Sequence, residues 1–169
     1  HVSLVGSEMC IRDRVSTARE IIADSDDRGC ELVLPSDVVI APALETGVYT
    51  DVVQIAGVPE DKMILDIGPE SVFGLSAKLT ECRTLLWNGP LGAFEVTPFD
   101  RSTNAIAITA AKLTRNGVMT SIAGGGDTVA ALNQAGVAKD FTYVSTAGGA
   151  FLEWLEGKQL PGVAALNGT

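Results

Sequence analysis

The chain has 169 residues, of which 46% are hydrophobic and 5% aromatic, a composition typical of one cytoplasmic α/β domain with alanine-rich helices. Its 12 basic and 21 acidic side chains give a net charge of −9, which argues against a nucleic-acid or membrane partner and favours a small molecule with a metal. The single histidine is at the N-terminus and the three cysteines are widely spaced, so we expect no histidine-based catalytic device, no disulfide framework and no zinc site.

The N-terminal part of the chain predicts one helix and two short strands. Residues 1–14 have neither clear helical nor strand periodicity. Apolar residues at helical spacing begin around Val15, and Gly29 sets the expected end of this helix. The runs Leu32–Leu34 and Val38–Ile40 then predict two short strands around a turn.

The second half of the chain repeats one local pattern three times: a buried strand, a glycine-rich loop and a helix. The strands are expected at 84–87, 118–122 and 141–145, the loops at 88–92, 123–127 and 146–149, and the helices at 100–114, 128–134 and 150–156. Such a series predicts a mainly parallel sheet with right-handed crossovers. All three loops then lie at the carboxyl ends of the strands, where open α/β sheets bind ligands.

The second glycine loop is the most informative segment. Gly124, Gly125 and Gly126 expose a run of backbone N–H groups at the start of a helix, and Asp127 adds a carboxylate. This combination predicts a phosphate cradle with a metal ligand. The alternative is a tight turn in which Asp127 serves only as the N-cap of the helix. Neither a Walker loop nor a dinucleotide fingerprint is present, so a nucleotide site has to be assembled from several loops.

Four motifs in this order carry a resemblance to a known family. They are LDIGPES at 65–71, LWNGPLGAFE at 86–95, GGGDT at 124–128 and VSTAGGA at 144–150, and the ending LEGKQLPGVAAL at 155–166 extends the similarity. Together they closely resemble the carboxyl-terminal half of phosphoglycerate kinase, over residues from about 15 to 166.

The resemblance implies a glycolytic kinase that transfers a phosphoryl group between 1,3-bisphosphoglycerate and ADP, giving 3-phosphoglycerate and ATP, with Mg²⁺. The family has two doubly wound, Rossmann-like domains, of which the first binds the phosphoglycerate and the second binds the nucleotide. It implies a cytoplasmic monomer whose partners are small molecules, with no nucleic acid and no membrane. Phosphoryl transfer mainly requires alignment and charge neutralisation, so the lack of a catalytic histidine is no obstacle.

The resemblance also assigns the glycine loop a role at the nucleotide phosphates. Gly124, Gly125, Gly126 and Thr128 would bind the phosphates, and Asp127 would hold the magnesium ion. A glycine suits each of these positions because a side chain would keep phosphate oxygens away from backbone donors.

Five further residues acquire roles by the same resemblance. Leu65 would line the adenine slot, Asn88 would lie beside the phosphate chain, and Glu95 would accept a hydrogen bond from the ribose. Gly148 and Gly149 would donate N–H groups to the phosphoryl group during transfer. Without the family match, Leu65 is equally well explained as a core residue, Asn88 as a turn residue and Glu95 as a surface acid.

No lysine or arginine lies inside the three glycine loops, although phosphoryl transfer needs cations. In the family the cations come from the amino-terminal domain and from a lysine-bearing segment early in the nucleotide domain. We therefore expect residues 15–169 to be part of a nucleotide-binding domain that is inactive alone, and residues 1–14 to be a non-native, adapter-like segment. The alternative is a complete, non-catalytic nucleotide-binding or structural module.

Overall fold

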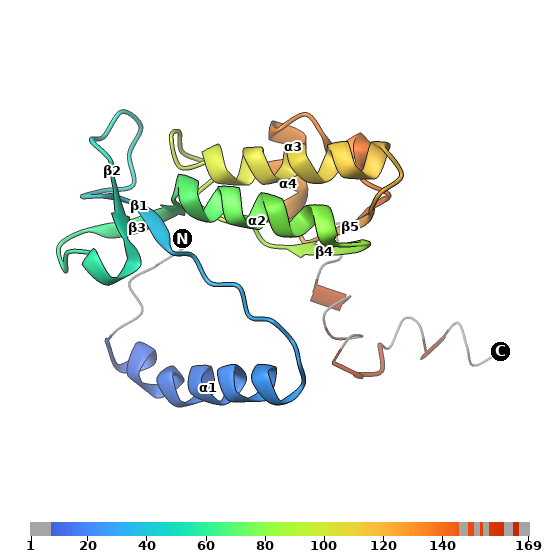
Figure 1. Cartoon of the computed structure of the whole chain (residues 1–169), viewed down its shortest axis with the longest axis horizontal. Helices are drawn as coiled ribbons and strands as arrows, with labels where there is room; N and C mark the ends of the chain where they lie inside the picture. The colour runs from blue at the N-terminus through green and yellow to red at the C-terminus, as the bar shows by residue number, and fades with distance from the viewer. Residues whose placement is uncertain (1–7, 146–148, 151–152, 154–155, 161–163, 166–169) are drawn as a thin grey trace. The chain divides into compact units, whose positions relative to one another are not determined.

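The computed structural model describes residues 8–145, 149–150, 153, 156–160 and 164–165 (Figure 1). The chain divides into two compact units, residues 1–34 and 35–169. The first unit contains one long helix, α1. The second contains two three-stranded sheets and the other described helices.

Helix α1 spans Glu8–Asp27 and ends in a glycine cap. Gly29 has a φ of 65°, and the N–H groups of Gly29 and Cys30 donate to carbonyls in the last turn at 3.2 and 2.8 Å. The predicted end of the helix is confirmed, but the helix also includes residues 8–14, for which the sequence shows no helical periodicity. Because residues 8–27 contain neither glycine nor proline, nothing in that stretch stops the helix from beginning earlier.

The predicted strand at Leu32–Leu34 does not form. Its three side chains are 45%, 46% and 67% exposed. A strand depends on hydrogen bonds to a neighbouring strand, and no strand in the described part of the chain pairs with this run. This apolar run therefore lacks the partner strand, among the described residues, that would make it a strand.

The second unit begins with an antiparallel sheet in the order β2-β1-β3. Its strands are β1 at Asp37–Ala41, β2 at Asp51–Gln54 and β3 at Met63–Ile67, and the short 3-10 helix η1 at Ile55–Gly57 follows β2. The predicted strand Val38–Ile40 lies within β1 and is confirmed. The sequence does not predict the antiparallel pairing, because β2 is only four residues long and half of it is polar.

A parallel sheet in the order β4-β5-β6 follows. The strands are β4 at Thr84–Asn88, β5 at Thr120–Gly124 and β6 at Tyr143–Ser145. The helices are α2 at Pro69–Glu81, α3 at Arg101–Arg115, α4 at Gly126–Gln134 and the 3-10 helix η2 at Ala138–Asp140. The predicted α/β fold with its parallel sheet is confirmed. Most of the helix expected at 150–156 lies outside the described residues.

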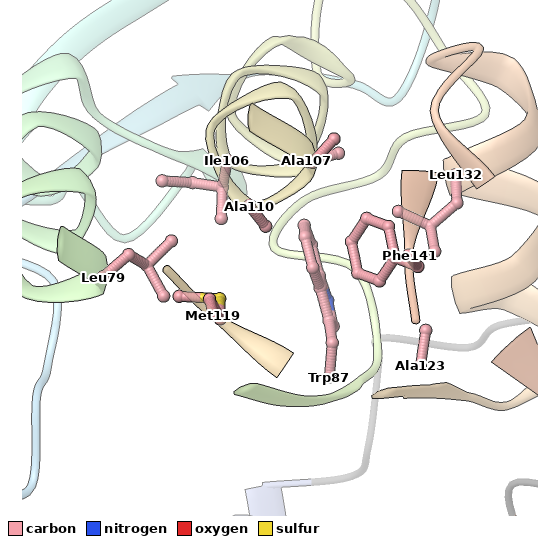
Figure 2. Packing of buried hydrophobic residues seen from close by; sticks show 10 residues of the cluster. Leu79, Trp87, Ile106, Ala107, Ala110, Met119, Ala123, Leu132 and Phe141 are labelled. Atoms are coloured by element: carbon pink, nitrogen blue, oxygen red, sulfur yellow. The ribbon is translucent and has the colours of Figure 1, made fainter. Parts of the chain in front are cut away.

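Apolar side chains from α3, α4 and the parallel sheet form the main core (Figure 2). Trp87 of β4 and Phe141 lie with their ring centroids 6.2 Å apart, at an interplanar angle of 49°. The other buried members are Leu79, Ile106, Ala107, Ala110, Ala111, Met119, Ala123 and Leu132. The alanines on α3 let this helix approach the sheet closely, which fixes the strands whose ends carry the glycine loops.

Two helices are capped by carboxylates from distant strands. Asp37 of β1 accepts hydrogen bonds from the N–H groups of Glu70 and Ser71 at 3.0 and 2.7 Å and from the Ser71 hydroxyl at 2.6 Å, at the start of α2. Burial alone would raise the pKa of Asp37, but these hydrogen bonds outweigh it and lower the pKa below its ordinary value. Asp66 of β3 similarly accepts from the N–H of Ser102 at 3.1 Å, at the start of α3.

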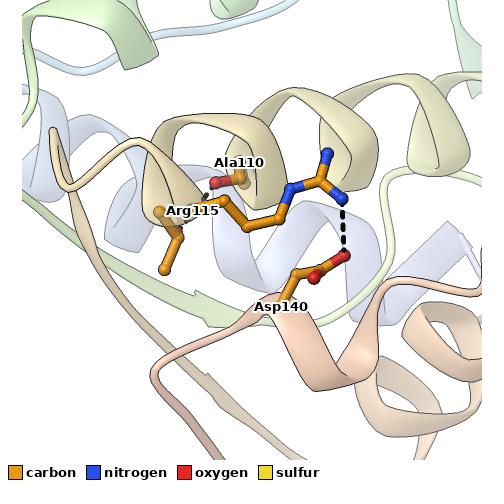
Figure 3. A network of polar contacts seen from close by, with 4 residues as sticks. Ala110, Arg115 and Asp140 are labelled. Carbon is orange, nitrogen blue, oxygen red and sulfur yellow. Dashed lines mark hydrogen bonds and ion pairs between the residues drawn. The ribbon is translucent and has the colours of Figure 1, made fainter.

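The carboxyl end of α3 is tied to the segment before β6 (Figure 3). Arg115 pairs with Asp140 of η2 at 3.4 Å, and the Thr114 hydroxyl donates to the carbonyl of Ala110 at 2.8 Å. Helix α3 ends shortly before β5 begins, and η2 lies shortly before β6 begins. The pair is therefore at the edge of the sheet where these strands begin, opposite the glycine loops. Arg115 is therefore engaged away from the candidate site.

Candidate functional site

The loops after β4 and β5 lie side by side at the carboxyl edge of the parallel sheet. Asn88 and Gly124, the last residues of the two strands, are paired in register. The N–H of Gly89 donates to the hydroxyl oxygen of Thr128 in α4 at 2.7 Å. The two glycine loops predicted to share one edge are therefore joined by a direct hydrogen bond.

Gly125 makes the turn from β5 into α4. Its φ of 96° is a left-handed conformation that disfavours any residue with a side chain. A Cβ on Gly125 would also lie 3.2 Å from the side-chain oxygen of Asn88. The N–H of Gly125 donates to the carbonyl of Ser145 at 3.1 Å, which brings the end of β6 to the same place. The turn therefore requires glycine because of its backbone conformation, and any side chain there would also come close to Asn88.

Helix α4 begins at Gly126, two residues before its predicted start, and its first two residues face solvent. Gly126 and Asp127 are both exposed. The first N–H groups of a helix have no carbonyl partner inside it, so this end attracts anions. The N-cap position belongs to Gly125, not to Asp127. The alternative explanation of Asp127 as a plain N-cap is therefore wrong, and its carboxylate is available at the helix entrance.

Thr128 is buried, although the resemblance assigns it to the phosphates. Its side chain is 2% exposed, and its hydroxyl oxygen accepts the hydrogen bond from Gly89. The structure thus gives Thr128 a position between the two loops, where it fixes their separation. Its hydroxyl proton is still free to rotate towards another acceptor.

The loop that carries Glu95 is fastened at both sides. The carbonyl of Phe94 accepts a hydrogen bond from the side-chain amide of Gln134, at the end of α4, at 3.1 Å. The N–H of Ala93 donates to the carbonyl of Leu65 in β3 at 2.8 Å. Glu95 itself is exposed. The sequence gives no signal for the contribution of Gln134, because the contact joins residues 40 positions apart.

Leu65 packs as a core residue. Its side chain is 3% exposed and forms a small cluster with Ala41 and Phe99. Its place in an adenine slot stays a prediction, since the described contacts are with the protein itself.

The third glycine loop is only partly described. Gly148 lies outside the described residues, whereas Gly149 is exposed and helical. Both assignments at the transferred phosphoryl group therefore stay predictions.

Gly92, in the loop after β4, has no room for a side chain. A Cβ on Gly92 would lie 2.3 Å from a carboxylate oxygen of Asp66 and 2.7 Å from the carbonyl oxygen of Phe99. Asp66 is 3% exposed, and burial raises its pKa, with Asp100 adding to the effect while hydrogen bonds from Ser102 and Ile67 oppose it. A glycine in this loop was visible in the sequence, but the carboxylate that requires it was not.

The donor set at the edge of the sheet fits a divalent cation only when a ligand supplies further oxygens. Among the described residues, no group of three or more His, Cys, Asp or Glu side chains is placed to hold a metal. Asp127 is one exposed carboxylate beside a helix N-terminus. This matches the usual coordination of Mg²⁺, which takes one or two carboxylates together with water and substrate phosphates.

Comparisons with known proteins show which family the sequence and the fold resemble. The sequence model described as "Phosphoglycerate kinase" matches residues 2–158. Phosphoglycerate kinases from Cereibacter sphaeroides strain ATCC 17025 and Chelativorans sp. strain BNC1 are 56% and 57% identical over 163 residues, which is 96% of this chain. The chain spans 41% of the length of these curated relatives.

Solved structures give the same result. The phosphoglycerate kinase from Coxiella burnetii aligns with a TM-score of 0.81 and 37% identity, over 86% of this chain and 37% of that one. The phosphoglycerate kinase from Pyrococcus horikoshii OT3 aligns with a TM-score of 0.73 and 25% identity, over 95% of this chain and 38% of that one.

Proposed function

The chain belongs to the phosphoglycerate kinase family, and we propose that it forms the part of such a kinase that binds the nucleotide. In the full-length protein the reaction is reversible phosphoryl transfer from 1,3-bisphosphoglycerate to MgADP, giving 3-phosphoglycerate and ATP. One observation carries the proposal: the loop from Gly124 to Asp127 opens α4 next to Asn88, at the carboxyl edge of the parallel sheet. Helix N-termini at this edge of α/β sheets are suited to phosphates.

The glycine loop would hold the phosphate chain of the nucleotide. The open first turn at Gly126 offers backbone donors without a side chain in front of them, since a Cβ on Gly126 would meet nothing within 4 Å. Gly124, Gly125 and Thr128 would fix the shape of this cradle, and Asn88 would lie beside the phosphates. Asp127 would hold Mg²⁺, which neutralises phosphate charge when it is bound.

Glu95 and Leu65 would contact the nucleoside. Glu95 is exposed, and the hydrogen bond between Phe94 and Gln134 holds its loop against α4. Its carboxylate would accept a hydrogen bond from a ribose hydroxyl. Leu65 would contribute the inner wall of the adenine slot. Gly148 and Gly149 would donate N–H groups to the phosphoryl group in transit.

The other half of the active site would come from a different part of the protein. The glycine loops of the chain contain no arginine or lysine, so the cations that stabilise the transferred phosphoryl group must be supplied elsewhere. We propose that an amino-terminal domain supplies them, together with the phosphoglycerate site. A cytoplasmic, monomeric enzyme with small-molecule partners is the corresponding proposal for the whole protein. Within the described residues, no helix has the length and apolar character needed to span a membrane.

Calorimetric titration of the chain with ADP, with and without Mg²⁺, tests the proposal. Because half of the site is elsewhere, we expect weak binding, with a Kd of about 1 mM, and dependence on Mg²⁺. Asp127→Asn should remove the dependence on Mg²⁺. Asp61→Asn, at an exposed acid whose contact with Lys62 is 3.7 Å long, is the matched control and should bind like the parent. Magnesium dependence that survives in Asp127→Asn would contradict the metal role.

A further inference from the structure

A pocket lies away from the glycine loops. Its volume is about 330 Å³, and it lies between the antiparallel sheet and the first turns of α2 and α3. Its lining includes Val52, Asp66, Val72, Pro98, Arg101 and Ser102. None of these residues belongs to the loops at 88–92 or 124–128. The volume is within the usual range for small-molecule sites, and most of the lining is apolar.

The buried polar groups of the pocket are already engaged. Asp66 accepts hydrogen bonds from the N–H groups of Ile67 and Ser102 at 2.9 and 3.1 Å. The Ser102 hydroxyl donates to the carbonyl of Ile67 at 2.8 Å. These groups shape the wall and hold the first turn of α3 against β3. A ligand therefore does not need to satisfy them.

Arg101 differs from these groups. It is the first residue of α3 and is exposed, and the described part of the chain gives it no ion pair and no hydrogen bond. A cation at this position also lies next to the positive end of the helix dipole, an arrangement that favours an anion nearby. The guanidinium group presents donors in a planar fork that matches a carboxylate.

We propose that this pocket binds a small organic carboxylate with an apolar body. The carboxylate pairs with Arg101 at the rim, and the apolar body contacts Val52, Val72 and Pro98. A cationic ligand is disfavoured at the rim, because the exposed guanidinium group of Arg101 would repel it. The site is separate from the proposed nucleotide site and does not depend on it.

NMR titration of the ¹⁵N-labelled chain tests the proposal with three probes of similar shape: 3-phenylpropionate, its neutral amide, and 3-phenylpropylammonium. We expect the carboxylate to bind most tightly and to shift the amides of Val52, Val72 and Arg101. Arg101→Gln should weaken carboxylate binding about threefold to fivefold and leave amide binding unchanged, as expected for an exposed ion pair. Lys112→Gln, on the last turn of the same helix, is the control and should have no effect.

Ala105→Leu provides a second variant that keeps the charge. The larger side chain occupies part of the pocket, so it should weaken both the carboxylate and the amide. Equal affinity for carboxylate and amide in the parent chain would overturn the role of Arg101, and tighter binding of the ammonium probe would overturn the ligand class. Shifts at the start of α4 in place of the pocket would overturn the site itself.

Discussion

Replacement of Asp37 by alanine should destabilise the second unit by about 3 kcal/mol at pH 7. The side chain is 3% exposed and accepts three hydrogen bonds at the start of α2, from two N–H groups and one hydroxyl. Each such bond to a charged group contributes about 1 kcal/mol once exchange with water at this helix end is allowed for. In urea unfolding, this loss lowers the midpoint by about 1.5 M if the slope is ~2 kcal/mol per M.

The loss should also depend on pH, in a direction set by the pKa of Asp37. The hydrogen bonds lower this pKa in the folded state below its ordinary value of 3.8. The contribution of the carboxylate is therefore complete above pH 3.8 and is lost as the pH falls through the folded-state pKa. The difference between the parent and Asp37→Ala should be full at pH 7 and smaller at about pH 3.

Asp61→Ala is the control for loss of a negative charge in the same unit. Asp61 is exposed and, among the described residues, pairs with Lys62 at 3.7 Å, so its removal should change the stability by less than about 0.5 kcal/mol. The reasoning is refuted if Asp37→Ala unfolds like Asp61→Ala at pH 7. It is also refuted if the loss in Asp37→Ala grows as the solution is acidified.

Three further predictions follow from single contacts. Gly92→Ala should lose about 2 kcal/mol or more of stability and melt at a lower temperature than the control Gly57→Ala. A Cβ on Gly92 would lie 2.3 Å from an Asp66 oxygen, whereas a Cβ on Gly57 meets nothing within 4 Å. Equal melting temperatures of the two variants would contradict the steric argument. Gly126→Ala should keep the chain folded, since a Cβ on Gly126 meets nothing within 4 Å. It should weaken MgADP binding in calorimetry, because the added methyl group covers the backbone donors. Unchanged affinity would contradict a role of Gly126 in phosphate binding. Burial raises the pKa of Asp66 in the folded state above its ordinary value of 3.8, so the parent loses stability as the pH rises from 3.8 through the folded-state pKa. Asp66→Asn does not titrate there, so its stability relative to the parent should increase over this range. Urea unfolding between pH 4 and 7 measures this trend, and its absence would show that Asp66 is not desolvated.

The sequence predicts the local parts of the fold well. A buried strand followed by glycines and a helix is a pattern of neighbouring residues, and β4, β5, α3 and α4 appear close to their expected positions. The exposed glycine entrance of α4 with Asp127 was predicted for the same reason. The glycine that ends α1 is likewise a local signal.

The parts that the sequence does not predict depend on distant contacts. Asp37 and Asp66 cap helices 34 and 36 residues away, and neither is recognisable as a cap from its neighbours. Thr128 looks like a phosphate contact in its motif, but its hydrogen bond to Gly89, 39 residues earlier, buries it between two loops. The failure of Leu32–Leu34 to form a strand has the same origin, because pairing depends on a partner that local sequence does not specify.

The most direct test of the central claim, that the glycine loop and Asp127 hold the metal–nucleotide complex, uses Mn²⁺ in place of Mg²⁺ in an NMR titration of the labelled chain with ADP. Paramagnetic broadening falls steeply with distance, so it maps the metal onto individual amides. We predict that the amides of Gly89, Gly125, Gly126 and Asp127 broaden first and that Asp127→Asn abolishes this pattern. Broadening that begins elsewhere on the acidic surface, or that is unchanged in Asp127→Asn, would contradict the account.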